Sequence, residues 1–372
     1  MTSEPANTGG RQVPDHTPTR LAIAGAGLIG RRHAEIIGQC DGVEVASITD
    51  PDLSARRFAA ERAIPWYPSL SEMLAADRPD GVIIATPNQM HVANGLECIA
   101  AGLPILVEKP IASDTASARQ LVDAAEQARL PILVGHHRRH NPLIQEAKRR
   151  IDAGEIGQTV AVHGSFWLYK PDDYFNVEWR TQPGAGPILI NLIHDIDLLR
   201  HLVGEVVAVQ AVTANRTRGF AVEDTAAIIL TFANGALGTF SVSDAIVAPW
   251  SWELTAGENP AYDRTDQTCY TIGGTHGSLE LPNGRIWRHE GERSWWSPIR
   301  SEPYTVGLED PLVRQIHHFA QVIRGEAAPL VSGEEGLRTL QVIDTIQRAA
   351  ASGQQVRLPN PYISQGHWQW QD

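Results

Sequence analysis

Cysteine is scarce in this chain: among 372 residues only Cys40, Cys98 and Cys269 occur. The three lie far apart and form no C-x-x-C pair, so neither a disulfide framework nor a thiolate zinc site fits them. A reducing compartment is the interpretation that this pattern favours.

Basic residues and long apolar runs are also in short supply. The chain has 31 Lys and Arg against 43 Asp and Glu, a formal net charge of −12, which repels a phosphate backbone and makes nucleic acid an unexpected partner. Apolar stretches such as residues 82–85 fall far short of the roughly 20 residues that span a membrane. Residues 1–18 lack the apolar segment of a secretory signal and are predicted to be a disordered leader. We therefore expect a cytoplasmic protein without a membrane partner.

From residue 19 onward, short apolar runs alternate with helical patterns. The runs predict buried strands, and the stretches between them predict helices with Ala-rich faces. The strands are expected at 20–25, 43–49, 81–85, 104–107 and 131–134, and the helices at 29–39, 53–63, 91–101 and 113–129. This alternation is typical of a doubly wound parallel sheet, so we predict an α/β Rossmann domain over residues 19–140.

The rhythm changes after about residue 141. Successive strands without intervening helices predict an α+β domain over residues 141–360, with a tail at 361–372. Phe240 and Val242 alternate with Thr239 and Ser241, as in an antiparallel strand with one buried face. The expected strands are 159–169, 205–215, 225–232, 236–243, 269–272, 278–281 and 285–288, and the expected helices are 142–153, 187–203, 311–324 and 334–351.

A glycine loop follows the first strand directly. Its G-x-G-x-x-G pattern consists of Gly25, Gly27 and Gly30 with Leu28 and Ile29 between them. Gly25 permits a tight turn, Gly27 lets the backbone approach a pyrophosphate, and Gly30 lets the following helix pack closely on the strand. The position predicts a dinucleotide site.

Asp50 ends the next strand, at the spacing where an acidic side chain accepts hydrogen bonds from the adenosine ribose. Its carboxylate, with Asp52 close by, would repel the 2′-phosphate of NADP, although Arg56 and Arg57 could relieve that repulsion. We therefore expect NAD as the cofactor and regard NADP as the weaker alternative.

Four segments together carry a family resemblance. They are the sequence AGAGLIG at 24–30, ATPNQMH at 85–91, EKP at 108–110 and NLIHDID at 191–197. In this order the chain, over about residues 19–358, resembles the Gfo/Idh/MocA oxidoreductases, which include glucose-fructose oxidoreductase and inositol dehydrogenase. The resemblance implies a large open, mainly antiparallel C-terminal sheet that often mediates homodimers or homotetramers. It also implies hydride transfer between a nicotinamide and a sugar, polyol or related hydroxylated ring.

Lys109 and His194 are the predicted catalytic residues. Lys109 ends an apolar strand at the edge where doubly wound folds bind ligands, and its charge would stabilise alkoxide character on a substrate hydroxyl. A neutral His194 imidazole can take the hydroxyl proton. The alternatives are a surface lysine paired with Glu108 and a core histidine satisfied by a neighbour.

The residues around His194 depart from one common family pattern, in which Asp or Asn stands four residues before the histidine. Ile190 occupies that position here. Asn191, three residues before His194, could share its helix face and orient substrate instead. Asp197 could hold the imidazole from the other side or face solvent.

Further site residues follow from the resemblance. Thr86, Pro87, Asn88 and His91 match a segment that lines the nicotinamide half of the cofactor, and Asn88 could also cap the next helix. Glu108, Lys109, Arg138 and Arg139 are expected beside cofactor or substrate. His136, His137 and His140 lack a carboxylate or cysteine partner at ligand spacing, so we predict no metal site.

Trp179 and Arg180 are the predicted substrate contacts, with Tyr169, Lys170 and Tyr174 just before them. An aromatic plane next to a cation that binds hydroxyl groups suits a carbohydrate, and ordinary packing of Trp179 is the alternative. The function we predict is an NAD-dependent dehydrogenase that oxidises a secondary hydroxyl. The rivals are an NAD-dependent glycoside hydrolase that uses transient oxidation and a non-catalytic sensor on the same fold.

Overall fold

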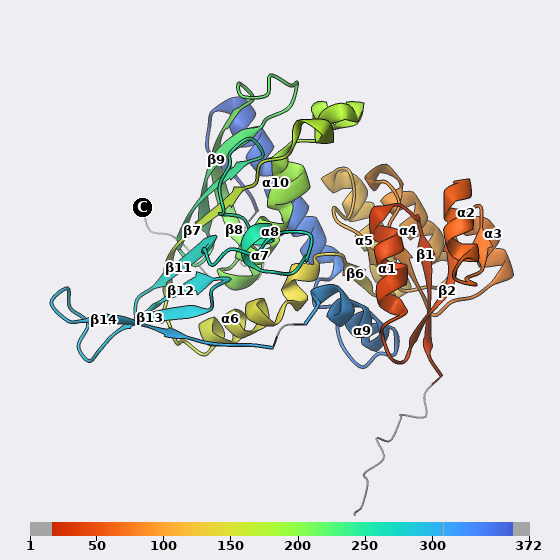
Figure 1. The fold of residues 1–372 in the computed structure, drawn as a ribbon, viewed down its shortest axis with the longest axis horizontal. Coiled ribbons are helices and arrows are strands. Elements are labelled where there is room, and N and C mark those ends of the chain that lie inside the picture. The colour runs from red at the N-terminus through yellow and green to blue at the C-terminus, as the bar shows by residue number, and fades with distance from the viewer. Residues whose placement is uncertain (1–16, 308, 360–372) are drawn as a thin grey trace, which may run out of the picture.

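The computed structural model describes residues 17–307 and 309–359 and consists of two sheets side by side (Figure 1). The predicted tail and all but the last two residues of the predicted leader lie outside this part of the chain. The first sheet is parallel throughout and has the order β3-β2-β1-β4-β5-β6. Its strands are β1 Thr19–Ala24, β2 Val43–Thr49, β3 Trp66–Tyr67, β4 Gly81–Ile84, β5 Ile105–Val107 and β6 Ile132–Val134. The predicted Rossmann topology is confirmed.

The helices of this half lie on both faces of the first sheet, as doubly wound connections require. They are α1 Leu28–Ile37, α2 Leu53–Ala60, α3 Leu70–Ala76, α4 His91–Ala100 and α5 Thr115–Ala128. Asp114 caps α5 by accepting from the Ser117 amide at 2.8 Å. The capping role considered for Asn88 is wrong, because Asn88 lies in a short 3₁₀ turn and the residue before α4 is Met90.

The second sheet has nine strands in the order β14-β13-β12-β11-β7-β10-β9-β8-β15. Neighbours pair antiparallel except β10 and β7, which run parallel. The strands are β7 Thr159–Trp167, β8 Val206–Ala214, β9 Thr225–Phe232, β10 Leu237–Ser243, β11 Tyr270–Gly274, β12 Ser278–Leu281, β13 Arg285–His289, β14 Ile299–Pro303 and β15 Val356–Arg357. The large, mainly antiparallel sheet is therefore confirmed, and β14 and β15 are additions to the predicted set.

The remaining helices cover one face of the second sheet and bridge to the first. They are α6 Pro142–Asp152, α7 Ile193–Leu202, α8 Trp252–Thr255, α9 Pro311–Ile323 and α10 Gly333–Ser352. Phe319 on α9 and Leu337 on α10 are fully buried in the core of the first sheet, whereas Ile343 further along α10 is buried in the core of the second. The C-terminal helices thus tie the two sheets together. No helix of the described residues is long and apolar enough to cross a membrane.

Candidate active site

The glycine loop connects β1 to α1 at the carboxyl edge of the first sheet. Gly25 has φ +93°, and a Cβ there would lie 2.6 Å from the Ala85 carbonyl oxygen. A Cβ on Gly30 would lie 1.9 Å from the Gly25 carbonyl oxygen, so helix and loop are in contact. Around Gly27, in contrast, a Cβ would meet nothing within 4 Å. Protein atoms pack tightly against the first and last glycines, whereas the space beside the middle glycine is free. This arrangement lets a pyrophosphate approach the backbone at Gly27.

Asp50 is bound to this loop by hydrogen bonds. Its Oδ2 accepts from the Ala26 amide at 2.7 Å, and its Oδ1 accepts from the Asp52 amide at 2.8 Å. Beside it, α1 starts at Leu28 without a side-chain cap, and the Leu28 side chain is 94% exposed. An uncapped helix end next to an oriented carboxylate fits the phosphates and ribose of a dinucleotide.

The segment after β4 is held in place by His91. The two ring nitrogens of His91 lie 2.8 Å from the carbonyl oxygens of Thr86 and Pro110, and the ring is buried. Asn94 donates to the Thr86 hydroxyl at 3.1 Å. Pro87 follows and is exposed, and Asn88 begins the short 3₁₀ turn and is half-buried. The buried His91 ring therefore connects the two segments predicted to bind cofactor, the one after β4 and the one after β5. Thr86 to Asn88 are at least partly exposed.

Glu108 and Lys109 directly follow β5, and their side chains bind different partners. His33 on α1 donates from Nε2 to Glu108 at 2.7 Å. Lys109 donates from Nζ to the carbonyl oxygen of Ile190 at 3.1 Å, so the alternative of a simple Lys109–Glu108 pair is wrong. Burial lowers the pKa of Lys109 to about 8. Through this hydrogen bond, the Lys109 ammonium from the first sheet contacts the segment that precedes His194.

That segment is not the continuous α-helix predicted for 187–203. Residues Ile188–Leu192 form a π-helical turn, and α7 begins only at Ile193. Such turns are uncommon and recur at functional sites. Residues three apart share a face in an α-helix, but this turn is π-helical. The prediction that Asn191 shares a helix face with His194 therefore loses its basis. The Oδ1 atom of Asn191 is buried and accepts no hydrogen bond from the part of the chain that the structure describes.

His194 lies among two other imidazoles from the segment after β6. Its ring centroid is 5.3 Å from that of His137 and 5.9 Å from that of His136, both in edge-on contacts. Burial, reinforced by the nearby charges of Lys109 and Arg138, holds the pKa of His194 well below its ordinary value. The imidazole is therefore neutral near pH 7 and able to accept a proton. Over the described residues, no group of three potential ligands is arranged to hold a metal ion.

Arg139 and Asp197 form a buried pair that the sequence did not predict. Arg139 donates from Nε and Nη2 to the two carboxylate oxygens of Asp197 at 2.8 and 2.7 Å, and from Nη2 to Glu335 at 2.9 Å. Asp197 therefore neither holds His194 nor faces solvent. The sequence predicts a cofactor contact for Arg139, but its guanidinium is engaged between α7 and α10 instead.

Arg138 is likewise engaged inside the protein. It donates to Glu253 at 2.6 Å and to Asp195 at 3.4 Å, and Tyr270 also donates to Asp195. Burial raises the pKa of Asp195 to about 7. This network lies under His194 and joins α7 to the second sheet, so Arg138 supports the site from within.

The predicted substrate segment lies between β7 and the π-helical turn. Arg180 donates to the Tyr174 carbonyl oxygen at 2.8 Å, and its guanidinium lies 4.1 Å from the Tyr174 ring centroid. Trp179 is 54% exposed. Lys170 is buried, its Nζ lies 3.6 Å from Oδ2 of Asp244, and its charge contributes to lowering the pKa of Lys109. Lys170 therefore joins the site, although the sequence marked it only by its aromatic neighbours.

The two sheets, with a glycine loop and acidic residue on one and a lysine-to-histidine junction between them, define an NAD-binding oxidoreductase of the two-domain class. The chain belongs to the Gfo/Idh/MocA family. The model described as "Oxidoreductase family, NAD-binding Rossmann fold" matches residues 19–136, and "GFO/IDH/MocA C-terminal domain" matches residues 144–280. The predicted resemblance is confirmed.

Similar proteins support the same assignment. The rhizopine catabolism protein MocA of Rhizobium meliloti is 30% identical over 88% of this chain and 94% of its own. D-apiose dehydrogenase of Paraburkholderia graminis is 27% identical, and the match covers 91% of this chain and 89% of that protein. Among solved structures, the WlbA dehydrogenase from Chromobacterium violaceum in complex with NADH and UDP-GlcNAcA has a TM-score of 0.76 and 27% identity, covering 93% and 97%.

Proposed function

We propose that this protein oxidises a secondary hydroxyl of a sugar, polyol or related hydroxylated ring with NAD. One observation carries the proposal: the Lys109 ammonium is bound to the carbonyl oxygen of Ile190, at the turn that leads directly into His194. A cation and a neutral base thereby share one site at the carboxyl edge of the first sheet. Oxidation of a hydroxyl removes a hydride from the carbon and a proton from the oxygen. It therefore requires both a base and a cation that stabilises the oxygen.

In this mechanism each residue has a separate task. Lys109 donates a hydrogen bond to the substrate oxygen and stabilises its developing negative charge. His194 accepts the hydroxyl proton. When bound, NAD supplies the nicotinamide that accepts the hydride. The glycine loop holds the pyrophosphate, and Asp50 accepts from the ribose, which favours NAD over NADP.

The names of the relatives support a hydroxylated substrate. D-apiose dehydrogenase and inositol 2-dehydrogenase are named for a sugar and a cyclic polyol. For this chain, Lys170, Trp179, Arg180 and Asn191 are the proposed substrate contacts. They combine hydrogen-bond donors with an exposed aromatic ring, which suits binding of several hydroxyl groups.

The test is a screen of NAD reduction over sugars, inositols, sugar acids and cyclic dihydrodiols. We expect net NADH with a member of this panel. Release of free sugar from a glycoside without net NADH would instead establish the hydrolase. NAD binding without turnover on the whole panel would contradict the dehydrogenase and leave the sensor.

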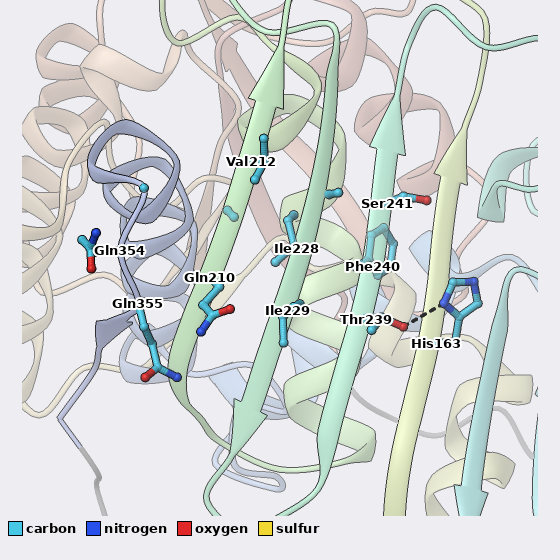
Figure 2. A pocket seen from close by; sticks show the side chains of 13 residues that line it. His163, Gln210, Val212, Ile228, Ile229, Thr239, Phe240, Ser241, Gln354 and Gln355 are labelled. Carbon is cyan, nitrogen blue, oxygen red and sulfur yellow. Dashed lines mark hydrogen bonds between the residues drawn. The ribbon is translucent and has the colours of Figure 1, made fainter.

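We also infer that a second copy of the chain covers the outer face of the second sheet. A shallow cavity of about 650 Å³ lies over β7 to β10 and the end of α10, and Figure 2 shows Gln210, Val212, Ile229 and Thr239 on this face. Val212 and Ile229 are 72% and 47% exposed, which is unusual for apolar strand residues. We expect a dimer or tetramer in sedimentation velocity that Ile229→Glu weakens and that Leu53→Glu, at an exposed position at the start of α2, does not. A monomeric wild-type protein would contradict this inference.

A further inference from the structure

The proposed oxidation releases a proton to a histidine that is almost completely buried. The hydroxyl proton goes to His194, a residue that is only 8% exposed. For a second turnover His194 must lose that proton. The sequence motif at 136–140, which the proposed function leaves without a role, supplies the next group. This inference therefore rests on the proposed function.

His137 is the neighbour of His194 that has a carboxyl partner of its own. Its ring centroid is 5.3 Å from that of His194. Its Nε2 lies 3.8 Å from Oε2 of Glu258, just beyond a direct hydrogen bond. Hydrogen bonds of catalytic groups are often this long before substrate binds. His137 thus lies between the proposed base and a carboxyl group.

Glu258 is held between His137 and a cavity. Its Oε1 accepts from Nδ2 of Asn141, the residue that caps α6, at 2.6 Å. The cavity has a volume of about 170 Å³, enough for several water molecules. It lies between the first turns of α6 and α9 and is lined by Asn141, Pro142, Glu258, Glu309, Asp310 and Pro311.

The charges around this path suit proton transfer. Burial raises the pKa of Glu258, with Glu253 adding to the effect and Arg138 and Asn141 opposing it. Burial lowers the pKa of His137 to about 3, with Arg138, Lys109 and His136 adding to the effect and Glu108 opposing it. A proton that reaches His137 is therefore held weakly, while the adjacent carboxyl group holds one more readily than an exposed carboxyl does.

We propose that the proton taken up by His194 leaves the site through His137 and Glu258 into the cavity between α6 and α9. The hydroxyl O–H bond breaks as His194 gains the proton. An imidazole can accept on one nitrogen and release from the other, so His137 receives this proton and passes one to Glu258. Glu258 releases it to water. One proton leaves for each hydride transferred, and both histidines return to their neutral forms.

The matched variants are Glu258→Gln and Glu309→Gln, which make the same chemical change in two side chains that line one cavity. Glu309 is exposed and accepts a hydrogen bond from Arg314 at 2.9 Å, whereas Glu258 is the carboxyl group found near His137. We expect Glu258→Gln to lower kcat about tenfold or more with an unchanged KM, since a direct acid or base contributes about 10²–10⁴. Added imidazole buffer should restore the rate of Glu258→Gln. Glu309→Gln should match the wild type.

Two results would overturn the proposal. One is a wild-type kcat in Glu258→Gln. The other is a loss of kcat that imidazole buffer does not restore, which would mean a structural role for Glu258. Thermal unfolding and NADH binding of each variant separate misfolding from loss of the path.

A spectroscopic measurement tests the contact between His137 and Glu258 even if no substrate is found in the screen. In protein labelled with ¹⁵N in the histidine rings, the His137 signals are identified by their loss in His137→Gln. We expect the Nε2 signal of His137 to move in Glu258→Gln and to stay in Glu309→Gln. An unmoved signal in Glu258→Gln would overturn the path whatever the activity. Absence of NADH formation across the panel would contradict the proposed function alone.

Discussion

The cofactor half and the substrate half of this site are built in different ways. In the cofactor half, the glycine loop and Asp50 lie close together in the sequence, and the backbone makes most of the contacts. In the substrate half, side chains from distant segments meet: Lys109 binds Ile190, His137 approaches Glu258, and Arg139 binds Asp197. Because of this difference, we expect mutations to affect NAD binding and the chemistry on the substrate separately.

The largest expected effect is in the substrate half. His194→Gln removes the proposed base while leaving a side chain of similar size. We expect kcat to fall by about 10²–10⁴, the usual contribution of a general base, with NADH affinity unchanged. Steady-state kinetics and fluorescence titration of NADH measure the two quantities. A parallel loss of both would show that the halves are not separable.

The cofactor half can be tested with two glycines. Gly30→Ala places a methyl group against the Gly25 carbonyl oxygen, so we expect destabilisation of about 1–3 kcal/mol together with loss of NADH binding. Gly27→Ala meets no protein atom within 4 Å, so it should weaken NADH binding without changing the free energy of unfolding. Unchanged NADH affinity in Gly27→Ala would contradict the proposed pyrophosphate position.

Replacing Arg139 tests whether this residue stabilises the fold or binds the cofactor. Arg139→Met leaves Asp197 buried without its partner, and we expect a loss of about 3–5 kcal/mol in the free energy of unfolding. Arg149→Met removes a guanidinium from an exposed pair on α6 and should leave stability essentially unchanged. Denaturant unfolding measures both variants. Loss of NADH affinity at unchanged stability would instead support the predicted cofactor contact.

The smallest expected effect is a change in pH dependence. Lys109 has a pKa near 8 and acts as a cation, so kcat/KM should fall as the pH rises through about 8 and the ammonium is lost. His194 stays neutral down to pH values well below 6.5, so no decline is expected toward pH 6. In Lys109→Arg the alkaline decline should disappear, since arginine keeps its charge. An acidic decline near pH 6.5 would contradict the account of His194.

Much of the fold was predictable from the sequence because local patterns encode it. Apart from the helix predicted at 187–203, whose first turn is π-helical, the predicted elements agree with the structure within three residues at each end. The glycine loop and Asp50 lie where the motif places them. The short elements β3, α3, α8, β14 and β15 were missed, since two to seven residues carry too little periodicity.

The substrate half was predictable only in part. A family motif predicts Lys109 and His194, but the apolar pattern does not distinguish the π-helical turn from an α-helix. The sequence predicts ligand contacts for Arg138 and Arg139 because no local signal marks Glu253, Asp197 or Glu335 as their partners. Contacts between distant segments depend on the tertiary fold and leave no pattern in either segment.

The most direct test of the central claim is Lys109→Ala, measured for turnover and for NADH affinity in the same preparation. The account predicts a loss of kcat of about 10²–10³ or more with NADH affinity and thermal unfolding close to wild type. Lys148→Ala, which removes an ammonium from the surface of α6, should match the wild type in all three. A fully active Lys109→Ala enzyme would contradict the assignment of Lys109 to the chemistry.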